Sequence, residues 1–128
     1  MQIEIRVYIE DTDMMGVVYH SNYLCFFERA RTEFLRQHEL TLTSMAKDGT
    51  YFAVRHLTID YKFSAKLDDV LRIHTTVKRR GFTQLVFYQK MYNQAAVLCA
   101  EATVIVVCLN DQWVATRLPQ QISKECIA

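Results

Sequence analysis

The stretch NYLCFFERARTEFLRQH, residues 22–38, decides the fold. Its apolar side chains recur at helical spacing and charged side chains fill the positions between them, which predicts one long amphipathic helix. Ser21 or Asn22 is expected to cap its start, because either side chain can accept a bond from the first free N–H groups. A shorter helix is predicted over 42–47, ending at Gly49.

Most of the remaining chain alternates between apolar and polar residues, which is the pattern of β-strands. Strands are predicted over 3–9, 56–63, 71–78, 83–92 and 113–115, and a nearly all-apolar strand, buried on both sides, over 96–109. A last helical turn is expected at Pro119. One long helix followed by antiparallel strands predicts a single α+β domain over 1–128, in which about five to six strands wrap the helix. The outer face of such a sheet is open, which favours association of copies through the sheet.

The composition is that of an ordinary soluble globular domain, with 51% apolar and 23% charged residues in 128. Fifteen Lys and Arg against 14 Asp and Glu give a net charge of +1, without the concentrated positive charge of nucleic-acid-binding proteins. The longest uninterrupted apolar run, 104–109, is too short to cross a bilayer. Only three glycines and one proline predict few, long elements.

The four cysteines form no C-x-x-C pair and no ligand spacing with the four histidines. We therefore expect reduced thiols in a cytoplasmic protein that uses neither a metal nor another cofactor. The first ten residues lack the apolar core of a signal peptide.

The loop before the long helix carries the groups that can do chemistry. Asp11 and Asp13 lie in this loop, and His20 stands at the mouth of the helix. Unpaired N–H groups at a helix start can polarise a carbonyl oxygen, and a nearby carboxylate can act as general base or nucleophile. An imidazole adds proton exchange near neutrality. These groups suffice to hydrolyse a thioester, although spacing alone favours the simpler reading that the acids only shape a turn beside the helix dipole.

A longer motif changes that balance. The run EDTDMMGVVYHSNY (10–23), continued by FFERARTEFL (26–35), resembles the signature of hot-dog-fold acyl-CoA thioesterases. The group is the 4-hydroxybenzoyl-CoA thioesterase-like one, and within it the bacterial Tol-Pal-associated acyl-CoA thioesterases. The resemblance extends along the chain. It implies a hot-dog fold, a homodimer or homotetramer with its active site at a dimer interface, and hydrolysis of acyl-CoA, or of an acyl carrier protein ester, to a carboxylic acid.

The resemblance also implies roles for individual residues. Asp13 maps onto the catalytic carboxylate, as base or nucleophile, and the N–H of His20 onto the donor to the thioester carbonyl. Further motif residues are expected to contact substrate, namely Gly16, Val17, Tyr19, Asn22 and Tyr23. Three basic residues, Lys66, Arg79 and Arg80, either bind coenzyme A phosphates or form solvated turns.

Several alternatives stay open. Glu28, on the helix, is an alternative candidate for the catalytic carboxylate, although a solvated side chain or one paired with Arg31 is favoured at this position. The chain departs from the family at Ile9, where an aromatic residue is common, and at Ser64-Ala65, where Pro-Ala is common. Both departures leave the acyl group, aliphatic or aromatic, undecided. A non-catalytic acyl-binding or scaffolding protein of the cell envelope is the alternative from another functional class.

Overall fold

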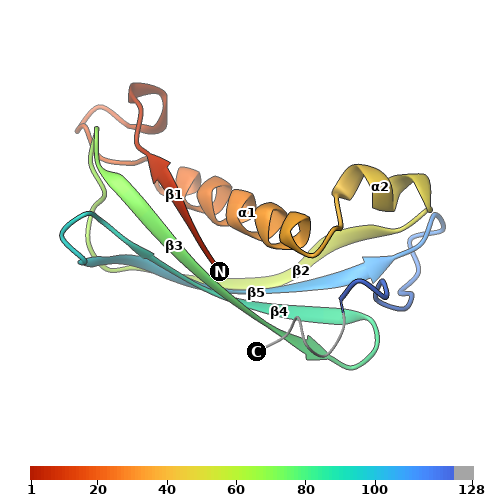
Figure 1. Ribbon diagram of the computed structural model, residues 1–128. Helices are drawn as coiled ribbons and strands as arrows, with labels where there is room; N and C mark the ends of the chain where they lie inside the picture. Colours follow the sequence, from red (N-terminus) through yellow and green to blue (C-terminus); the bar gives the residue numbers. More distant parts are fainter. Residues whose placement is uncertain (123–128) are drawn as a thin grey trace.

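The computed structural model of the chain describes residues 1–122. Five strands form one antiparallel sheet in the order β1-β3-β4-β5-β2, and the long helix lies across its concave face (Figure 1). The elements follow one another as β1 (Gln2–Arg6), η1 (Ile9–Asp11), α1 (His20–Gln37), α2 (Leu42–Lys47), β2 (Tyr51–Tyr61), β3 (Val70–Arg80), β4 (Gln84–Tyr92) and β5 (Leu98–Leu109). This arrangement confirms the predicted α+β fold with a sheet wrapped around one helix.

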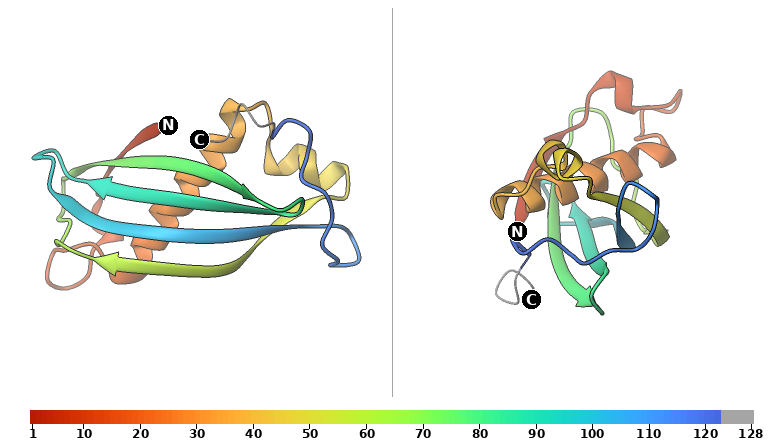
Figure 2. Two further views of the ribbon diagram at one scale, coloured as in Figure 1. Left: turned by 90° about the horizontal axis from the view of Figure 1, so that it is seen from below. Right: turned by 90° about the vertical axis from the view of Figure 1, so that its right-hand side faces the viewer.

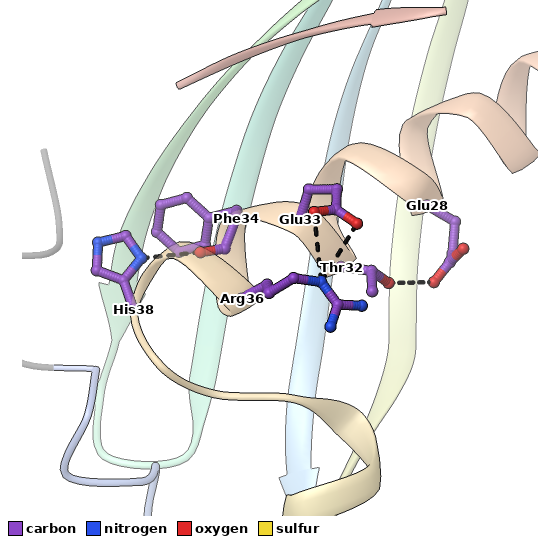
Figure 3. Close-up of polar contacts among 6 residues, drawn as sticks. All are labelled: Glu28, Thr32, Glu33, Phe34, Arg36 and His38. Carbon is purple, nitrogen blue, oxygen red and sulfur yellow. Dashed lines mark hydrogen bonds and ion pairs between the residues drawn. The ribbon is translucent and has the colours of Figure 1, made fainter.

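Helix α1 begins at His20, two residues before the predicted start. The expected cap was wrong, because Ser21 and Asn22 lie inside the helix and the N-cap residue is Tyr19, whose side chain makes no capping bond. The buried face of α1 carries Tyr23, Phe26, Phe27, Ala30, Phe34 and Leu35. Figure 3 shows polar pairs along the C-terminal half of α1: Thr32 with Glu28, Arg36 with Glu33, and the His38 ring with the Phe34 carbonyl.

The inner face of the sheet packs against this helix. Along β3 and β4, every second side chain is buried, as the alternating pattern predicted. Two of the buried side chains are polar, Thr75 on β3 and Gln89 on β4. Gln89 donates to the Phe27 carbonyl (2.9 Å) and to Thr75 Oγ1 (3.2 Å). Because a buried amide must find partners, these bonds hold α1 in one position along the sheet.

Strands β5 and β2 differ from expectation. Strand β5 is buried on its inner side only, and its other side chains are half-buried, so the prediction of burial on both sides was wrong. Strand β2 starts at Tyr51, five residues before the predicted start, and forms one edge of the sheet (Figure 2). Most of its residues are exposed in the single chain. The molecule therefore presents a long open edge beside α1.

Three smaller predictions fail at chain reversals. Strand β1 ends at Arg6 because the chain turns into the short helix η1. The segment 113–115 forms only a single bridge, between Ala115 and Leu109. Pro119 starts a single hydrogen-bonded turn closed by Ile122 N–H, instead of a helical turn. In contrast, α2 is confirmed, with Gly49 at its end in the left-handed region (φ +69°).

Candidate active site

The loop between β1 and α1 is built around the buried carboxylate of Asp11, whose exposure is 6%. One carboxylate oxygen, Oδ2, accepts the N–H of Tyr8 (2.8 Å), and the other, Oδ1, accepts Asn22 Nδ2 (3.1 Å). The main-chain oxygen of Asp11 accepts the N–H of Tyr19 (2.9 Å). Asp11 is therefore committed to joining the loop to the first turn of α1.

Asp13 lies two residues further along the same loop, and its side chain is exposed. Its Oδ1 accepts the N–H of Met15 (2.8 Å), and its main chain bonds Val17 and Gly16 across the turn. Gly16 has φ +76°, the left-handed conformation that glycine adopts without strain. Within the described part of the chain, Asp13 Oδ2 has no hydrogen-bond donor, so this oxygen is available to a water molecule or a substrate.

The start of α1 offers hydrogen-bond donors beside this carboxylate. Among residues 1–122, the N–H groups of His20 and Ser21 have no acceptor. The helix dipole concentrates partial positive charge at these groups. The His20 ring packs at 4.5 Å against the ring of Tyr19 and is exposed to solvent.

Asp13 and His20 line the same open hollow of about 320 Å³. The other lining residues come from the loop, from the first turn of α1 and from the end of β2, and they are Val17, Val18, Tyr23, Tyr61, Lys62, Phe63 and Ser64. The loop is held beside the segment after β2 by Val18 N–H to Ala65 O (2.8 Å) and Leu67 N–H to Gly16 O (3.1 Å). The carboxylate of Asp13 and His20, the first residue of α1, thus line one space whose wall is part polar and part apolar.

Tyr23 forms the floor of this hollow and is 4% exposed. Its hydroxyl accepts the N–H of Ala65 (3.0 Å), and its ring meets the ring of Tyr61 edge-on at 5.2 Å. Burial raises the pKa of the Tyr23 phenol above its ordinary value of 10.0, so this group stays protonated near neutrality. Tyr23 therefore shapes the hollow and supplies no charge.

A profile of the thioesterase-like superfamily matches residues 7–125 of the chain. The chain belongs to this superfamily. The acyl-CoA thioester hydrolase YbgC of Escherichia coli O6:H1 is 43% identical over 122 residues, which cover 94% of this chain and 91% of that protein. This membership makes the chain a thioester hydrolase.

Solved structures agree with the relationship. A probable thioesterase from Bartonella henselae superposes with a TM-score of 0.87 at 35% identity, covering 93% of this thioesterase and 98% of that chain. A 1,4-dihydroxy-2-naphthoyl-CoA thioesterase from Synechocystis superposes with a TM-score of 0.89 at 26% identity, covering 94% and 90%. The hot-dog fold expected from the motif is confirmed.

The thioesterase brings together only part of the residues expected to contact substrate. Val17 and Tyr23 line the hollow with Asp13 and His20. Gly16, Tyr19 and Asn22 are not among its lining residues. Asn22 instead bonds Asp11, and Gly16 shapes the turn.

Five lining residues were not predicted. One is Val18 of the loop before α1, and the others come from the end of β2 and the segment after it: Tyr61, Lys62, Phe63 and Ser64. Their alternating pattern predicted a strand but carries no information about which strand end meets the start of the helix. Two sequence signals pointed to this loop, namely the departure from the family pattern at Ser64-Ala65 and the candidate phosphate-binding residue Lys66.

The basic residues of the thioesterase do not form one cluster. The main chain of Lys66 forms an isolated antiparallel β-bridge with Val17 beside the hollow, whereas Arg79 and Arg80 lie at the far end of β3. Eleven residues at about 3.3 Å each separate the two ends of that strand by roughly 30 Å. Within one protomer, these residues cannot contact the same phosphate group.

Glu28, the rival carboxylate, lies outside the hollow of Asp13. Its carboxylate accepts Thr32 Oγ1 (2.6 Å), while Arg31 donates to Gln89 Oε1 (3.2 Å). Of the two favoured alternatives, Glu28 is therefore the exposed, solvated side chain and not the partner of Arg31. Glu28 and Arg31 line a second hollow of about 120 Å³, whose apolar wall includes Leu42 and Val54. This hollow lies between α1, α2 and the first half of β2.

Two general properties of the described residues complete the picture of the thioesterase. No group of three or more His, Cys, Asp or Glu side chains within residues 1–122 is arranged to hold a metal ion. None of the helices in that part of the chain combines the length and the apolar character needed to cross a membrane.

Proposed function

We propose that this thioesterase hydrolyses acyl-CoA to a carboxylic acid and free coenzyme A in the hollow at the start of α1. One observation carries the proposal: Asp13, whose Oδ2 has no donor among the described residues, and His20, whose N–H has no acceptor among them, line the same hollow. A thioester needs both groups, because its carbonyl carbon must be attacked while its oxygen gains negative charge. The function of the E. coli relative supports this choice of substrate.

In the proposed reaction, the thioester carbonyl oxygen lies against the N–H of His20. Asp13 takes a proton from water, and the water oxygen adds to the carbonyl carbon. The helix N–H groups stabilise the resulting oxyanion. When the carbon–oxygen double bond re-forms, the carbon–sulfur bond breaks and the coenzyme A thiolate leaves. The proton on Asp13 returns to the sulfur, relayed by the His20 imidazole.

The same carboxylate offers a second route, in which an Asp13 oxygen attacks the carbonyl carbon and expels the thiolate directly. Water then hydrolyses the mixed anhydride and restores the carboxylate. A rapidly quenched single turnover separates the routes, because only the second one leaves the acyl group on the Asp13 peptide, where mass spectrometry detects it.

The acyl group and its carrier are the finer part of the proposal. Phe63, Tyr61 and Val17 provide apolar wall area for an aliphatic chain, and the aromatic rings also suit an aromatic acyl group. The Synechocystis relative acts on an aromatic acyl-CoA, which supports keeping aromatic esters as the second candidate. Lys66 beside the hollow suits the phosphates of coenzyme A and equally the phosphopantetheine of acyl carrier protein.

We further propose that two copies pair through β2 into a homodimer, and that such dimers can join into a tetramer. The support is the open edge of β2, which carries exposed Val54 and Leu57 and offers unpaired N–H and carbonyl groups to another strand. Antiparallel pairing about a two-fold axis sets the start of one β2 beside the end of the other. In this arrangement, the second hollow, at Val54, faces the Asp13 hollow of the partner. Arg79 and Arg80 then lie at the end of the dimer where the Asp13 hollow of the partner is found.

A cytoplasmic location is proposed on the strength of the thiols. Cys25, Cys99 and Cys108 are free, and the last two are buried, which suits a reducing compartment. The association with the Tol-Pal system that the motif implies stays a prediction.

Thiol release tests the enzymatic proposal. The wild-type protein is mixed with a series of aliphatic acyl-CoA esters, an aromatic acyl-CoA and an acyl carrier protein ester, and the free thiol is read with a dye. Asp13→Asn, which keeps the shape of the side chain, should lower the rate by about 10²–10⁴-fold without lowering the melting temperature. Near wild-type turnover by this variant would refute the role of Asp13. No release from any ester would favour the non-catalytic, acyl-binding alternative.

A further inference from the structure

The end of the edge strand contacts the first helical peptide of the active site. The hydroxyl of Tyr61, the last residue of β2, donates to the main-chain oxygen of His20 at 3.0 Å. Tyr61 lines the Asp13 hollow, and its ring is held edge-on by the buried ring of Tyr23. A tyrosine from a distant strand therefore bonds the peptide group at the helix start.

The bonded carbonyl belongs to the same peptide unit as the N–H of Ser21. That N–H is one of the two at the start of α1 that have no acceptor within the described residues. A hydrogen bond donated to an amide carbonyl draws electron density from the peptide, and its N–H becomes a stronger donor, because linked hydrogen bonds polarise one another. The Tyr61 hydroxyl thus acts on the N–H that follows, in the first turn of α1, the His20 N–H of the proposed mechanism.

We propose that Tyr61 is a positioning residue of the thioesterase, which orients and polarises the His20–Ser21 peptide so that Ser21 N–H serves as a second oxyanion donor beside His20 N–H. The inference rests on the proposed hydrolytic function. Neither the sequence motif nor the helix start by itself indicates Ser21 N–H as a donor or Tyr61 as the side chain that orients it.

Tyr23 provides a matched control. Its hydroxyl accepts a main-chain N–H at Ala65 and does not contact the helix-start peptide through a hydrogen bond. Removing the Tyr23 hydroxyl should therefore cost stability and leave the oxyanion donors intact. Removing the Tyr61 hydroxyl should have the opposite effect, because that group is half-exposed and its loss leaves no buried donor unpaired.

The kinetic test compares Tyr61→Phe with wild type in thiol release from the best acyl-CoA ester. We expect Tyr61→Phe to lower kcat by about 3–10-fold, as the loss of one hydrogen bond would, with KM changed less than about twofold. Replacing Tyr61 by 3-fluorotyrosine, a stronger hydrogen-bond donor, should raise kcat above wild type. If Tyr61 had only a structural role, kcat would not increase in the order Tyr61→Phe, wild type, 3-fluorotyrosine protein. An unchanged kcat in Tyr61→Phe, or no response to fluorination, would overturn the proposal.

A substrate-free measurement keeps the test independent of activity. In the ¹H–¹⁵N spectrum, the Ser21 amide proton of Tyr61→Phe should shift upfield from its wild-type position, and that of Tyr23→Phe should not. Loss of activity in Asp13→Asn with an unmoved Ser21 signal in Tyr61→Phe would reject the role of Tyr61 and keep the hydrolytic function. An upfield shift in a protein that cleaves no ester would reject the hydrolytic function alone and leave a polarised anion-binding peptide.

Discussion

Asn22 Nδ2 lies 3.1 Å from Asp11 Oδ1, and this hydrogen bond distinguishes Asp11 from Asp13, the other acid of the loop. Both carboxylate oxygens of Asp11 accept hydrogen bonds from the protein, whereas Asp13 keeps one oxygen free at the surface of the hollow. Asp11 thus joins the loop to the first turn of α1, and Asp13 is the acid that we propose for catalysis.

Asp11→Asn should therefore act on stability more than on catalysis. An amide presents an NH₂ group to one of the two donors, Tyr8 N–H or Asn22 Nδ2, which leaves a buried polar group unpaired. We expect the free energy of unfolding to fall by about 1–3 kcal/mol, measured by urea denaturation. The loss in kcat should be much smaller than in Asp13→Asn. A reversed order of the two kcat losses would mean that Asp11 is the catalytic acid.

Gly16→Ala tests the geometry of the active-site loop. Gly16 has φ +76°, and an added Cβ would meet no atom within 4 Å, so the cost is conformational, about 1 kcal/mol. Gly81→Ala is the control, because Gly81 has φ +67°, equally open surroundings and a place in the distant β3–β4 turn. Both variants should lose similar stability in thermal unfolding, but only Gly16→Ala should lower kcat, because Gly81 is remote from Asp13 and His20. Equal kcat values would show that the loop tolerates displacement.

Mixed oligomers test the proposed pairing through β2. Asp13→Asn removes the base, and Val54→Trp fills the second hollow, so each variant alone should be inactive. When the two are co-expressed, half of the dimers are mixed and one of their two sites is intact, which predicts about a quarter of wild-type activity.

The mixed preparation discriminates between two arrangements. Recovered thiol release requires that Asp13 of one protomer works beside Val54 of the other. An inactive mixture in which mass spectrometry detects mixed dimers would place both groups of each site in one protomer.

The stability of the protein should also respond to alkaline pH through Cys108. Burial raises the pKa of the Cys108 thiol to about 11, against an ordinary value of 9.0. The folded state holds this proton more tightly than the unfolded chain, so the contribution is complete below pH 9 and is lost as pH rises through 11. The loss amounts to at most about 3 kcal/mol.

Cys108→Ala isolates this contribution. Urea denaturation at about pH 8 and about pH 10.5 should show a steeper fall in unfolding free energy for wild type than for the variant. Burial also raises the pKa of Tyr23 and Cys99, but these groups contribute equally to both proteins. If the unfolding free energies of the wild type and of Cys108→Ala fell in parallel with pH, the alkaline loss of stability would not come from Cys108.

The sequence by itself determined the elements and the chemistry of the motif. Residues 22–38 repeat at helical spacing, and β3 and β4 alternate, so local periodicity predicted these elements within a few residues. The resemblance of 10–35 to thioesterases named the reaction. Local pattern works here because each element buries one face, and the spacing of its apolar residues records which face that is.

Tertiary structure decided which groups meet. The bond that joins the first turn of α1 to buried Asp11 and the contact between Tyr61 and His20 span 11 and 41 positions of the chain. No local pattern specifies such bonds, because they arise only when the sheet curves around the helix and brings the end of β2 to its first turn. The same curvature leaves β2 exposed as an edge, so the proposed pairing with a second copy follows from the fold and not from any motif.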